Sequence, residues 1–363
     1  MSAAIEGAAG TEIWTEFCDR LARAAATMTL PGAPTAPMDQ AEGARYLSRV
    51  LRLGLEIYLE GGDPDFPSFI RPSHETAKLG GDNPDNLYLS ATIAGDRTYR
   101  LKGNVGTVRF LSIGSKANRY ATDGTMASTG ELGADGFGAD SDGNFTIIAS
   151  KERPLDGTAW LPLADDSNIL QIRQTFLDRA DEIPASFQIE RISAGPASPA
   201  ALTPDTIQTR LSSAADFVAN STRLFAGWAE KFMTRPNQMC DWGQDMFQKA
   251  GGDPAIFYIH GYWRLAPDEM LEITTDVPVC EHWNIQVNNW WMESLDYRFV
   301  PANINMGNAV PNADDTVTIQ LSHDDPGQPN WLTTHGHGEG FLLLRWVRAD
   351  SHPIPRISVI KRG

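Results

Sequence analysis

The sequence contains little cysteine, and its cysteines are widely spaced. Cys18, Cys240 and Cys280 are the three among 363 residues. An odd and scattered set provides neither a disulfide framework nor a cysteine-based zinc motif, and it favours a reducing compartment.

Basic residues and long apolar runs are also scarce. Lysine and arginine number 30 against 46 aspartates and glutamates, which gives a net charge of −16. Affinity for a phosphate backbone depends on clustered basic side chains, so we expect no nucleic-acid partner. No apolar run reaches the roughly 18 residues that a membrane-spanning helix needs, and the first residues lack the basic and apolar regions of a signal peptide. We therefore expect no membrane partner and a cytoplasmic location.

Motifs for nucleotide binding and for serine nucleophiles are absent as well. No GxGxxG segment follows a predicted strand and opens a helix, and no GxSxG elbow is present. Ser322, His323 and Asp324 are adjacent, whereas a catalytic triad is assembled from distant segments. His323 is interpreted as a turn residue or, alternatively, as a candidate base. No organic cofactor is predicted, and a divalent metal stays a candidate.

The chain contains an internal repeat, in which Asp142–Ile192 resembles Asp314–Lys361. The aligned pairs are Thr146 with Thr318, Ile147 with Ile319, Trp160 with Trp331, and Arg173 with Arg345. Such self-similarity indicates two related units in one chain. Short alternating strands separated by glycine and proline turns are typical of sandwiches and jelly rolls. We therefore predict a mainly β protein with added helices, built from two tandem related β-sandwich (jelly-roll-like) domains.

Helical periodicity marks three longer segments and one shorter one. They are Thr11–Met28, Asp39–Glu60 with Asp39 as its cap, Thr203–Thr234, and Trp242–Ala250. Thr203 followed by Pro204 is a typical helix start, and this long helix is predicted to brace the two β domains. The predicted divisions are a helical segment 1–75, a first sandwich 76–198, a helical connector 199–252 and a second sandwich 253–363. Residues 114–144, rich in Gly, Ser, Thr and Asp, are predicted to form long loops.

A first candidate site is the segment Thr334–Gly340, with the sequence THGHGEG. In an extended chain His335, His337 and Glu339 would share one face. Two imidazoles at this spacing, with a carboxylate, can hold a metal ion. The alternative is a glycine-rich turn whose histidines bond locally. The first copy of the repeat has no histidine here, so a site would belong to the second half.

A second candidate site is Glu281–Arg298, with the sequence EHWNIQVNNWWMESLDYR. Alternation places four polar side chains on one face and three apolar ones on the other. The polar set is His282, Asn284, Gln286 and Asn288, and the apolar set is Trp283, Ile285 and Val287. The polar face lines a pocket or, alternatively, faces solvent. Glu293 and Asp296 follow two tryptophans; such carboxylates divide acid and base roles when their environments differ, or they form a solvated turn.

Several stretches resemble a bacterial family known as "domain of unknown function 1214". They are GGDNPDNLYLSATIAGDRTYRLKG, DPAIFYIHGYWRLAPDEMLEI, HWNIQVNNWWMESLDYRF and DPGQPNWLTTHGHGEGFLLLRW. The similarity runs from Asn83 to the C-terminus and is most specific in Trp283–Arg298 and Asp325–Trp346. It implies a β-sandwich C-terminal domain after a helical and β N-terminal part, and no settled activity. Where the family pattern is NWLDTxGH, this chain has Thr333 in place of Asp, while Gly336-His337 fits the GH pair. Of the two histidines in this segment, the resemblance therefore favours His337 as the functional one.

The first functional hypothesis is a hydrolase or lyase that uses general acid–base chemistry on a small organic or glycosidic substrate. Its site would lie on the second β domain, near the first domain and the long helix. The predicted catalytic residues are Glu293, Asp296 and His337. The predicted substrate-binding residues are Trp283, Asn289, Trp290, Asn330, Trp331 and Arg345.

Two other hypotheses remain open at this point. The protein could be a non-catalytic carbohydrate or metabolite binder, which would tolerate loss of the carboxylates but not of the tryptophans. Alternatively, the tryptophans simply fill the core. Arg345, aligned with Arg173, is interpreted as part of a buried ion pair or as a clamp for a ligand carboxylate. A homo-oligomer is a further possibility.

Overall fold

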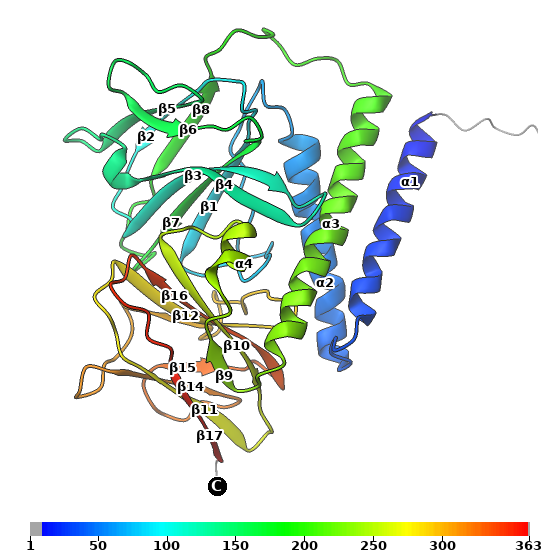
Figure 1. Cartoon of the computed structure of the whole chain (residues 1–363). Helices are drawn as coiled ribbons and strands as arrows, with labels where there is room; N and C mark the ends of the chain where they lie inside the picture. The colour runs from blue at the N-terminus through cyan, green and yellow to red at the C-terminus, as the bar shows by residue number, and fades with distance from the viewer. Residues whose placement is uncertain (1–8, 362–363) are drawn as a thin grey trace, which may run out of the picture.

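The computed structural model describes residues 9–361, which form two β sandwiches and a group of helices (Figure 1). The first sandwich pairs a sheet of order β1-β7-β3-β4 with a sheet of order β6-β5-β2-β8. Its strands are β1 Asn86–Thr92, β2 Tyr99–Asn104, β3 Phe110–Arg119, β4 Thr125–Gly133, β5 Asn144–Ser150, β6 Ala159–Pro162, β7 Ile169–Thr175 and β8 Ser186–Arg191.

The second sandwich has the same topology, with every strand number raised by nine. Its sheets have the orders β10-β16-β12-β13 and β15-β14-β11-β17. The strands are β10 Ile256–Arg264, β11 Glu269–Thr275, β12 His282–Asn288, β13 Asn303–Asn305, β14 Val317–Ser322, β15 Trp331–Thr333, β16 Glu339–Val347 and β17 Arg356–Lys361. The prediction of two related β sandwiches with added helices is confirmed.

The strand registers agree with the sequence repeat residue by residue. In the first half Trp160 pairs with Ile148 in the parallel β5–β6 ladder, and Trp331 pairs with Gln320 in the equivalent β14–β15 ladder. Across β1 and β7 Tyr88 lies opposite Arg173, and across β10 and β16 Tyr258 lies opposite Arg345. The two arginines therefore occupy equivalent positions in the two sandwiches.

Each sandwich has its own apolar core, because alternate residues of a strand face opposite sides of the sheet. In β16, Leu342, Leu344 and Trp346 point into the second core, whereas Leu343 and Arg345 point away from it. The outward faces of β1, β7, β10 and β16 are thus free to meet each other. The buried space between the two sandwiches is built from these outward faces and from the helices.

The helices are α1 Ala9–Ala24, α2 Pro37–Gly54, α3 Pro204–Phe232 and α4 Gln244–Lys249. Short additional elements are the 3-10 turns Ala25–Thr29 and Ala134–Gly136, the π-helical turn Leu55–Glu60 and the strand β9 Gln238–Cys240. Asp39 lies in the first turn of α2, which begins at Pro37 after Ala36, so Asp39 is not the cap. Thr203 is the cap of α3, as predicted, because its side chain accepts a hydrogen bond from the Thr206 backbone N–H.

Helix α3 runs past both sandwiches and packs against α1 and α2 (Figure 1). Its phenylalanines enter a core shared with the second sandwich, where Phe225 and Phe232 join Phe341 and Trp291. The predicted bracing role of this helix is confirmed. Among residues 9–361, no helix combines the length and the apolar character needed to cross a bilayer.

The prediction of long loops across residues 114–144 is wrong. This region contains the second half of β3 and all of β4, which pair from Ser112 with Gly133 to Arg119 with Thr125. Glycine, alanine and glutamate are depleted in strands, but pairing along a neighbouring strand overrides this preference. A register shift between Ser115 and Lys116 interrupts the ladder.

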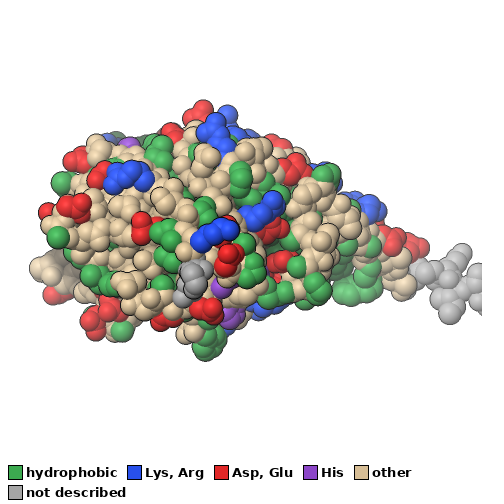
Figure 2. All heavy atoms as spheres, turned by 90° about the horizontal axis from the view of Figure 1, so that it is seen from below, with side chains coloured by type: hydrophobic (Ala, Val, Ile, Leu, Met, Phe, Trp, Pro, Cys, Tyr) green, Lys and Arg blue, Asp and Glu red, His purple; other side chains and the backbone are tan. Residues whose placement is uncertain are grey.

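Charges on the surface of the second sandwich are mixed rather than gathered by sign. Figure 2 views the molecule from the end that carries β11 and β17 and shows acidic and basic side chains interspersed with apolar ones. Ion pairs at this end include Arg356 with Asp276 at 3.7 Å and Lys361 with Asp268 at 3.9 Å. Such exposed pairs contribute little to stability.

Candidate functional site

The two sandwiches meet through equivalent surfaces, and two arginines make the reciprocal contacts. Arg345, from the second half, donates to the Gly81 carbonyl, just before β1, at 2.5 Å. Arg173, from the first half, donates to the Gly251 carbonyl, just before β10. Each half therefore holds the loop that enters the first strand of the other half.

The same entry loops are fixed within each half by equivalent tyrosines. The Asn83 N–H donates to the Tyr88 hydroxyl at 3.1 Å, and the Asp253 N–H donates to the Tyr258 hydroxyl at 2.9 Å. Such self-complementary contacts are the hallmark of an isologous interface. Here they occur inside one chain, between two copies of one fold.

Strand β12 supplies much of the polar interface. Its alternation is as predicted, and the polar face of His282, Asn284, Gln286 and Asn288 is fully buried. Asn284 donates to Asn83 Oδ1 at 2.5 Å, and Gln286 donates to the Asp82 carbonyl at 2.7 Å. Buried polar groups need such partners. This face therefore binds the entry loop of the first sandwich instead of facing solvent.

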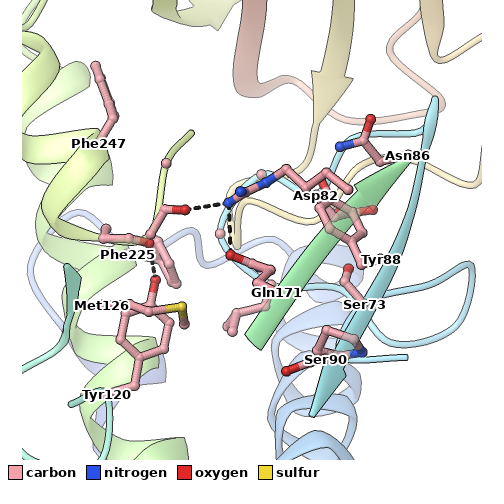
Figure 3. A pocket seen from close by; sticks show the side chains of 18 of the residues that line it. Ser73, Asp82, Asn86, Tyr88, Ser90, Tyr120, Met126, Gln171, Phe225 and Phe247 are labelled. Atoms are coloured by element: carbon pink, nitrogen blue, oxygen red, sulfur yellow. Dashed lines mark hydrogen bonds between the residues drawn. The ribbon is translucent and has the colours of Figure 1, made fainter. Parts of the chain in front are cut away.

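A cavity of about 160 Å³ lies where the outward faces of β1 and β7 meet those of β10 and β16. Helices α3 and α4 and the end of the β3–β4 hairpin contribute further walls. Its aromatic lining consists of Tyr88, Tyr120, Phe217, Phe225, Trp228, Phe247 and Tyr258. Its principal polar lining consists of Asp82, Ser90, Gln171, Arg173, His260 and Arg345. Figure 3 shows Tyr120, Met126 and Phe225 on one side, facing Tyr88, Gln171 and Ser90 on the other.

The two arginines of the cavity differ in their counter-charges. Arg173 Nη1 lies 3.6 Å from Asp253 Oδ2. Arg345 is 5% exposed, and within the described part of the chain no carboxylate oxygen lies within 4 Å of its guanidinium nitrogens. It donates to Gln286 Oε1 and to the Gly81 carbonyl, which uses two of its five N–H donors. The cavity therefore has a buried cation with donors available to an anion.

Two further polar groups of the cavity, His260 and Tyr258, are uncharged at neutral pH. Burial, and then the nearby Arg345 charge, hold the pKa of His260 well below 6.5. Its ring stacks on Phe247 with centroids 4.3 Å apart, and its Nδ1 is buried without a hydrogen-bond partner among residues 9–361. Burial raises the pKa of Tyr258 to about 12. These groups offer neutral donors and acceptors around the cation.

Two of the predicted catalytic residues join one buried network away from the cavity. Glu293 is ion-paired with Arg49 of α2 at 2.6 Å and accepts from Asn289 at 3.1 Å. Asn289 also donates to Glu42 Oε2 at 2.9 Å, and His337 Nε2 lies 3.3 Å from that same oxygen. Burial raises the pKa of Glu293, and Arg49 opposes the rise. The network joins α2 to the second sandwich.

Asp296 does not belong to this network. Its carboxylate pairs with Arg298 at 2.7 Å on the partly exposed turn after Glu293. This hydrogen bond lowers the pKa of Asp296. The expected pairing of Glu293 and Asp296 as acid and base around one substrate is therefore not assembled, and the turn interpretation fits Asp296.

The three tryptophans predicted to wall the site lie in separate places. Trp283 points into the second sandwich, where its ring lies 6.0 Å from that of Trp346. Trp290 belongs to the core under α3 and donates to Met233 Sδ, and Trp331 lies on the edge strand β15. Asn330 accepts from the Val310 N–H and donates to the Val310 carbonyl in a turn. Of the predicted substrate-binding residues, Arg345 lines the cavity.

The candidate metal set His335, His337 and Glu339 is also not brought together. Its premise was an extended chain, but β15 ends at Thr333 and β16 begins at Glu339, and His335 between them has a φ of 50°. His335 is exposed, whereas Glu339 accepts from Arg264 at 2.8 Å and from Tyr262. His337 alone turns inward, where Asp39 and Glu42 of α2 meet it.

The sequence analysis did not identify several residues of the cavity, nor the two acidic residues beside His337. Tyr88 and Tyr258 carried a usable signal, since the Gly-Gly-Asp loops before β1 and β10 and the tyrosines that follow them repeat along the chain. His260 carried none, because the equivalent position in the first half is Ser90. Asp39 and Glu42 carried none, because they are almost 300 positions from His337.

Comparison with known proteins gives a family and no activity. The family model "Protein of unknown function (DUF1214)" matches residues 264–351. An uncharacterized protein from Burkholderia cenocepacia is 44% identical, with 96% of each chain covered and a TM-score of 0.93. A protein from Vibrio parahaemolyticus shares the fold at 13% identity, with 87% of this chain and 97% of that one covered and a TM-score of 0.50. No curated protein matches the chain. The identity to the Burkholderia protein over almost its whole length, together with the matching model, means that this chain belongs to the DUF1214 family.

Proposed function

We propose that this protein binds a small organic anion with a compact aromatic body in the cavity between its two sandwiches. The observation that carries the proposal is Arg345, a buried guanidinium at the cavity wall with no carboxylate within 4 Å among residues 9–361. Buried charges are normally paired. A ligand carboxylate would supply the missing counter-charge, and a guanidinium binds carboxylates with good geometry.

The size and walls of the cavity support the aromatic part of the proposal. Its volume of about 160 Å³ is comparable to the roughly 150 Å³ cavity that holds benzene in another protein. Phe225, Trp228 and Phe247 provide apolar surface on the helical side, and aromatic pairs prefer stacked or edge-to-face arrangements. Ser90, Gln171 and His260 can orient polar substituents of the ring.

A second candidate is a hydrolase or lyase that acts in this same cavity. One observation favours it: His260 is buried, its Nδ1 has no hydrogen-bond partner among the described residues, and its lowered pKa keeps the imidazole neutral. A neutral imidazole can accept a proton from a bound substrate. His260→Phe would then abolish turnover while leaving most of the ligand affinity, whereas in a binding protein no turnover exists to be lost.

The test of binding compares benzoate with benzamide, which has the same shape and no charge. Trp228 lines the cavity, so occupancy should change the intrinsic fluorescence, with Trp228→Phe as the check. Benzoate is expected to bind at least about tenfold more tightly, since a hydrogen bond to a charged group contributes about 1.5–3 kcal/mol. A panel of monocyclic aromatic carboxylates extends the comparison.

Three variants make the test specific. Arg345→Gln should weaken benzoate binding about tenfold or more, and Ser90→Leu should block it by filling the cavity. Arg356→Gln removes the same charge from an exposed position on β17 and should leave affinity unchanged. Equal affinity for benzoate and benzamide, or undiminished binding in Ser90→Leu, would rule out this cavity as the anion site.

A further inference from the structure

A second polar centre lies outside the cavity, at the junction of α2 with the turn between β15 and β16. Asp39 and Glu42 are three positions apart on α2, so their side chains share one face of the helix. His337 reaches them from the turn, and one ligand atom from each of the three residues lies within 4.8 Å of the others. Asp39 is 6% exposed and His337 is 1% exposed.

The two nitrogens of His337 are in different situations. Nδ1 lies 2.9 Å from Asp39 Oδ1, a hydrogen bond in which the ring must be the donor because a carboxylate only accepts. Nε2 lies 3.3 Å from Glu42 Oε2 but is buried without a hydrogen-bond partner in the described part of the chain. When the ring is neutral and Nδ1 carries the proton, His337 Nε2 and Glu42 Oε2 are both acceptors, and they face each other without a hydrogen between them.

The surrounding charges leave one carboxylate without a fixed counter-ion. Glu42 pairs with Arg45 at 2.7 Å, and Glu293 pairs with Arg49 at 2.6 Å. Among residues 9–361, the one basic side chain within 4 Å of the Asp39 carboxylate is the His337 imidazole. A positive charge beside His337 Nε2 would balance the negative charge of this group, and a bound cation provides that charge without protonating the ring.

We infer that His337, Glu42 and Asp39 form a binding site for a divalent transition metal, with His337 Nε2 and Glu42 Oε2 as direct ligands. Their separation of 3.3 Å is close to the edge, about 3.4 Å, of a tetrahedron with bonds of about 2.1 Å to nitrogen and oxygen. A metal-bound histidine commonly donates its other N–H to a carboxylate, which is the role of Asp39 here.

Neighbouring residues hold this arrangement in place. Asn289 donates to Glu42 Oε2 at 2.9 Å and orients the carboxylate. Trp291 donates its indole N–H to the Asp39 carbonyl at 2.9 Å, which fixes the first turn of α2 against the second sandwich. One imidazole with one carboxylate suits Zn²⁺ or Mn²⁺. Water would fill the remaining positions.

The test measures metal content directly and needs no ligand for the cavity, so it is independent of the proposed function. Untagged protein purified without chelator is analysed for metals, and stripped protein is titrated with Zn²⁺ and with Mn²⁺. Wild type should hold about one equivalent. His337→Gln and Glu42→Gln should each lose it. His335→Gln is the matched control, since this exposed histidine two residues away should be dispensable.

Two outcomes would overturn the inference. One is wild-type protein that contains no metal and takes up neither ion. The other is that the His337→Gln and Glu42→Gln variants keep no less metal than His335→Gln does. If His337→Gln fails to fold, as judged by circular dichroism, Glu42→Gln decides, because its amide can still accept the hydrogen bond from Asn289.

Discussion

Replacing the two equivalent arginines one at a time should separate a structural role from a ligand-binding one. Arg173 and Arg345 hold the same register position in the two sandwiches, and each donates to a glycine carbonyl of the other half. They differ in counter-charge, since Asp253 lies 3.6 Å from Arg173. We expect Arg173→Gln to cost more stability and Arg345→Gln to cost more ligand affinity.

The magnitudes follow from what each substitution leaves behind. Arg345→Gln removes two charge-assisted hydrogen bonds, to Gln286 and to Gly81, and glutamine recovers part of them, so we expect a loss of about 2–3 kcal/mol. Arg173→Gln also leaves Asp253, 2% exposed, without its cation. Breaking a buried pair from one side costs about 3–5 kcal/mol. The difference between the variants should therefore be about 1–2 kcal/mol.

Urea unfolding of both variants, followed by circular dichroism, gives the order of stability from the midpoints. Benzoate titrations of the same preparations give the order of affinity, which should be the reverse. Equal affinity in both variants, with Arg345→Gln at least as destabilised as Arg173→Gln, would mean that Arg345 only ties the Gly81 loop to the second sandwich. The anion site would then be refuted.

Three further predictions concern stability. The pKa of His260 is below its unfolded value, so the free energy of unfolding should be highest above pH 6.5 and should fall below it, by at most about 1.4 kcal/mol per pH unit. The urea midpoint of His260→Phe should depend less on pH in this range than that of the wild type, and an unchanged slope would contradict the assignment. Thr203→Ala should lower the melting temperature through loss of about 1 kcal/mol at the α3 cap, with Thr203→Ser close to wild type. Gly81→Ala should destabilise more than Gly138→Ala: both have positive φ, but a Cβ at Gly81 would lie 2.3 Å from Leu343 Cδ2, whereas Gly138 has open space.

Much of the fold could be predicted because its signals are local or repeated. The alternation of His282–Asn288 and the cap at Thr203 each depend on a few neighbouring residues. The sequence repeat indicated that the two sandwiches share one topology. Strand β4, Thr125–Gly133, was missed because its two glycines, its alanine and its glutamate have weak strand propensity and its pairing with β3 decides its conformation.

The candidate sites were harder to predict because their residues meet only in the tertiary structure. The repeat match with Arg173 pointed to Arg345, but its position between two sandwiches depends on contacts with Gly81, 264 positions away. The alternation of β12 already placed Trp283 on the face opposite the polar residues, which is the face of the sandwich core. That position was not compatible with Trp283 as part of a tryptophan wall around a substrate. The acidic partners of His337 lie on a helix that the sequence marked only by its periodicity, with Asp39 as its cap.

The internal symmetry itself distinguishes interface from site. Positions that bind the two halves together are the same in both copies, namely the tyrosine–arginine pairs Tyr88 with Arg173 and Tyr258 with Arg345. The next pair along the same strands differs: Ser90 lies opposite Gln171 in the first half, and His260 lies opposite Leu343 in the second. All four of these residues line the cavity. A symmetric cavity would present the same groups twice, whereas this one has a polar side and a histidine–apolar side. Arg345, the proposed partner of the ligand anion, lies on the histidine–apolar side, and joining the two sandwiches in one chain is what allows the two sides to differ.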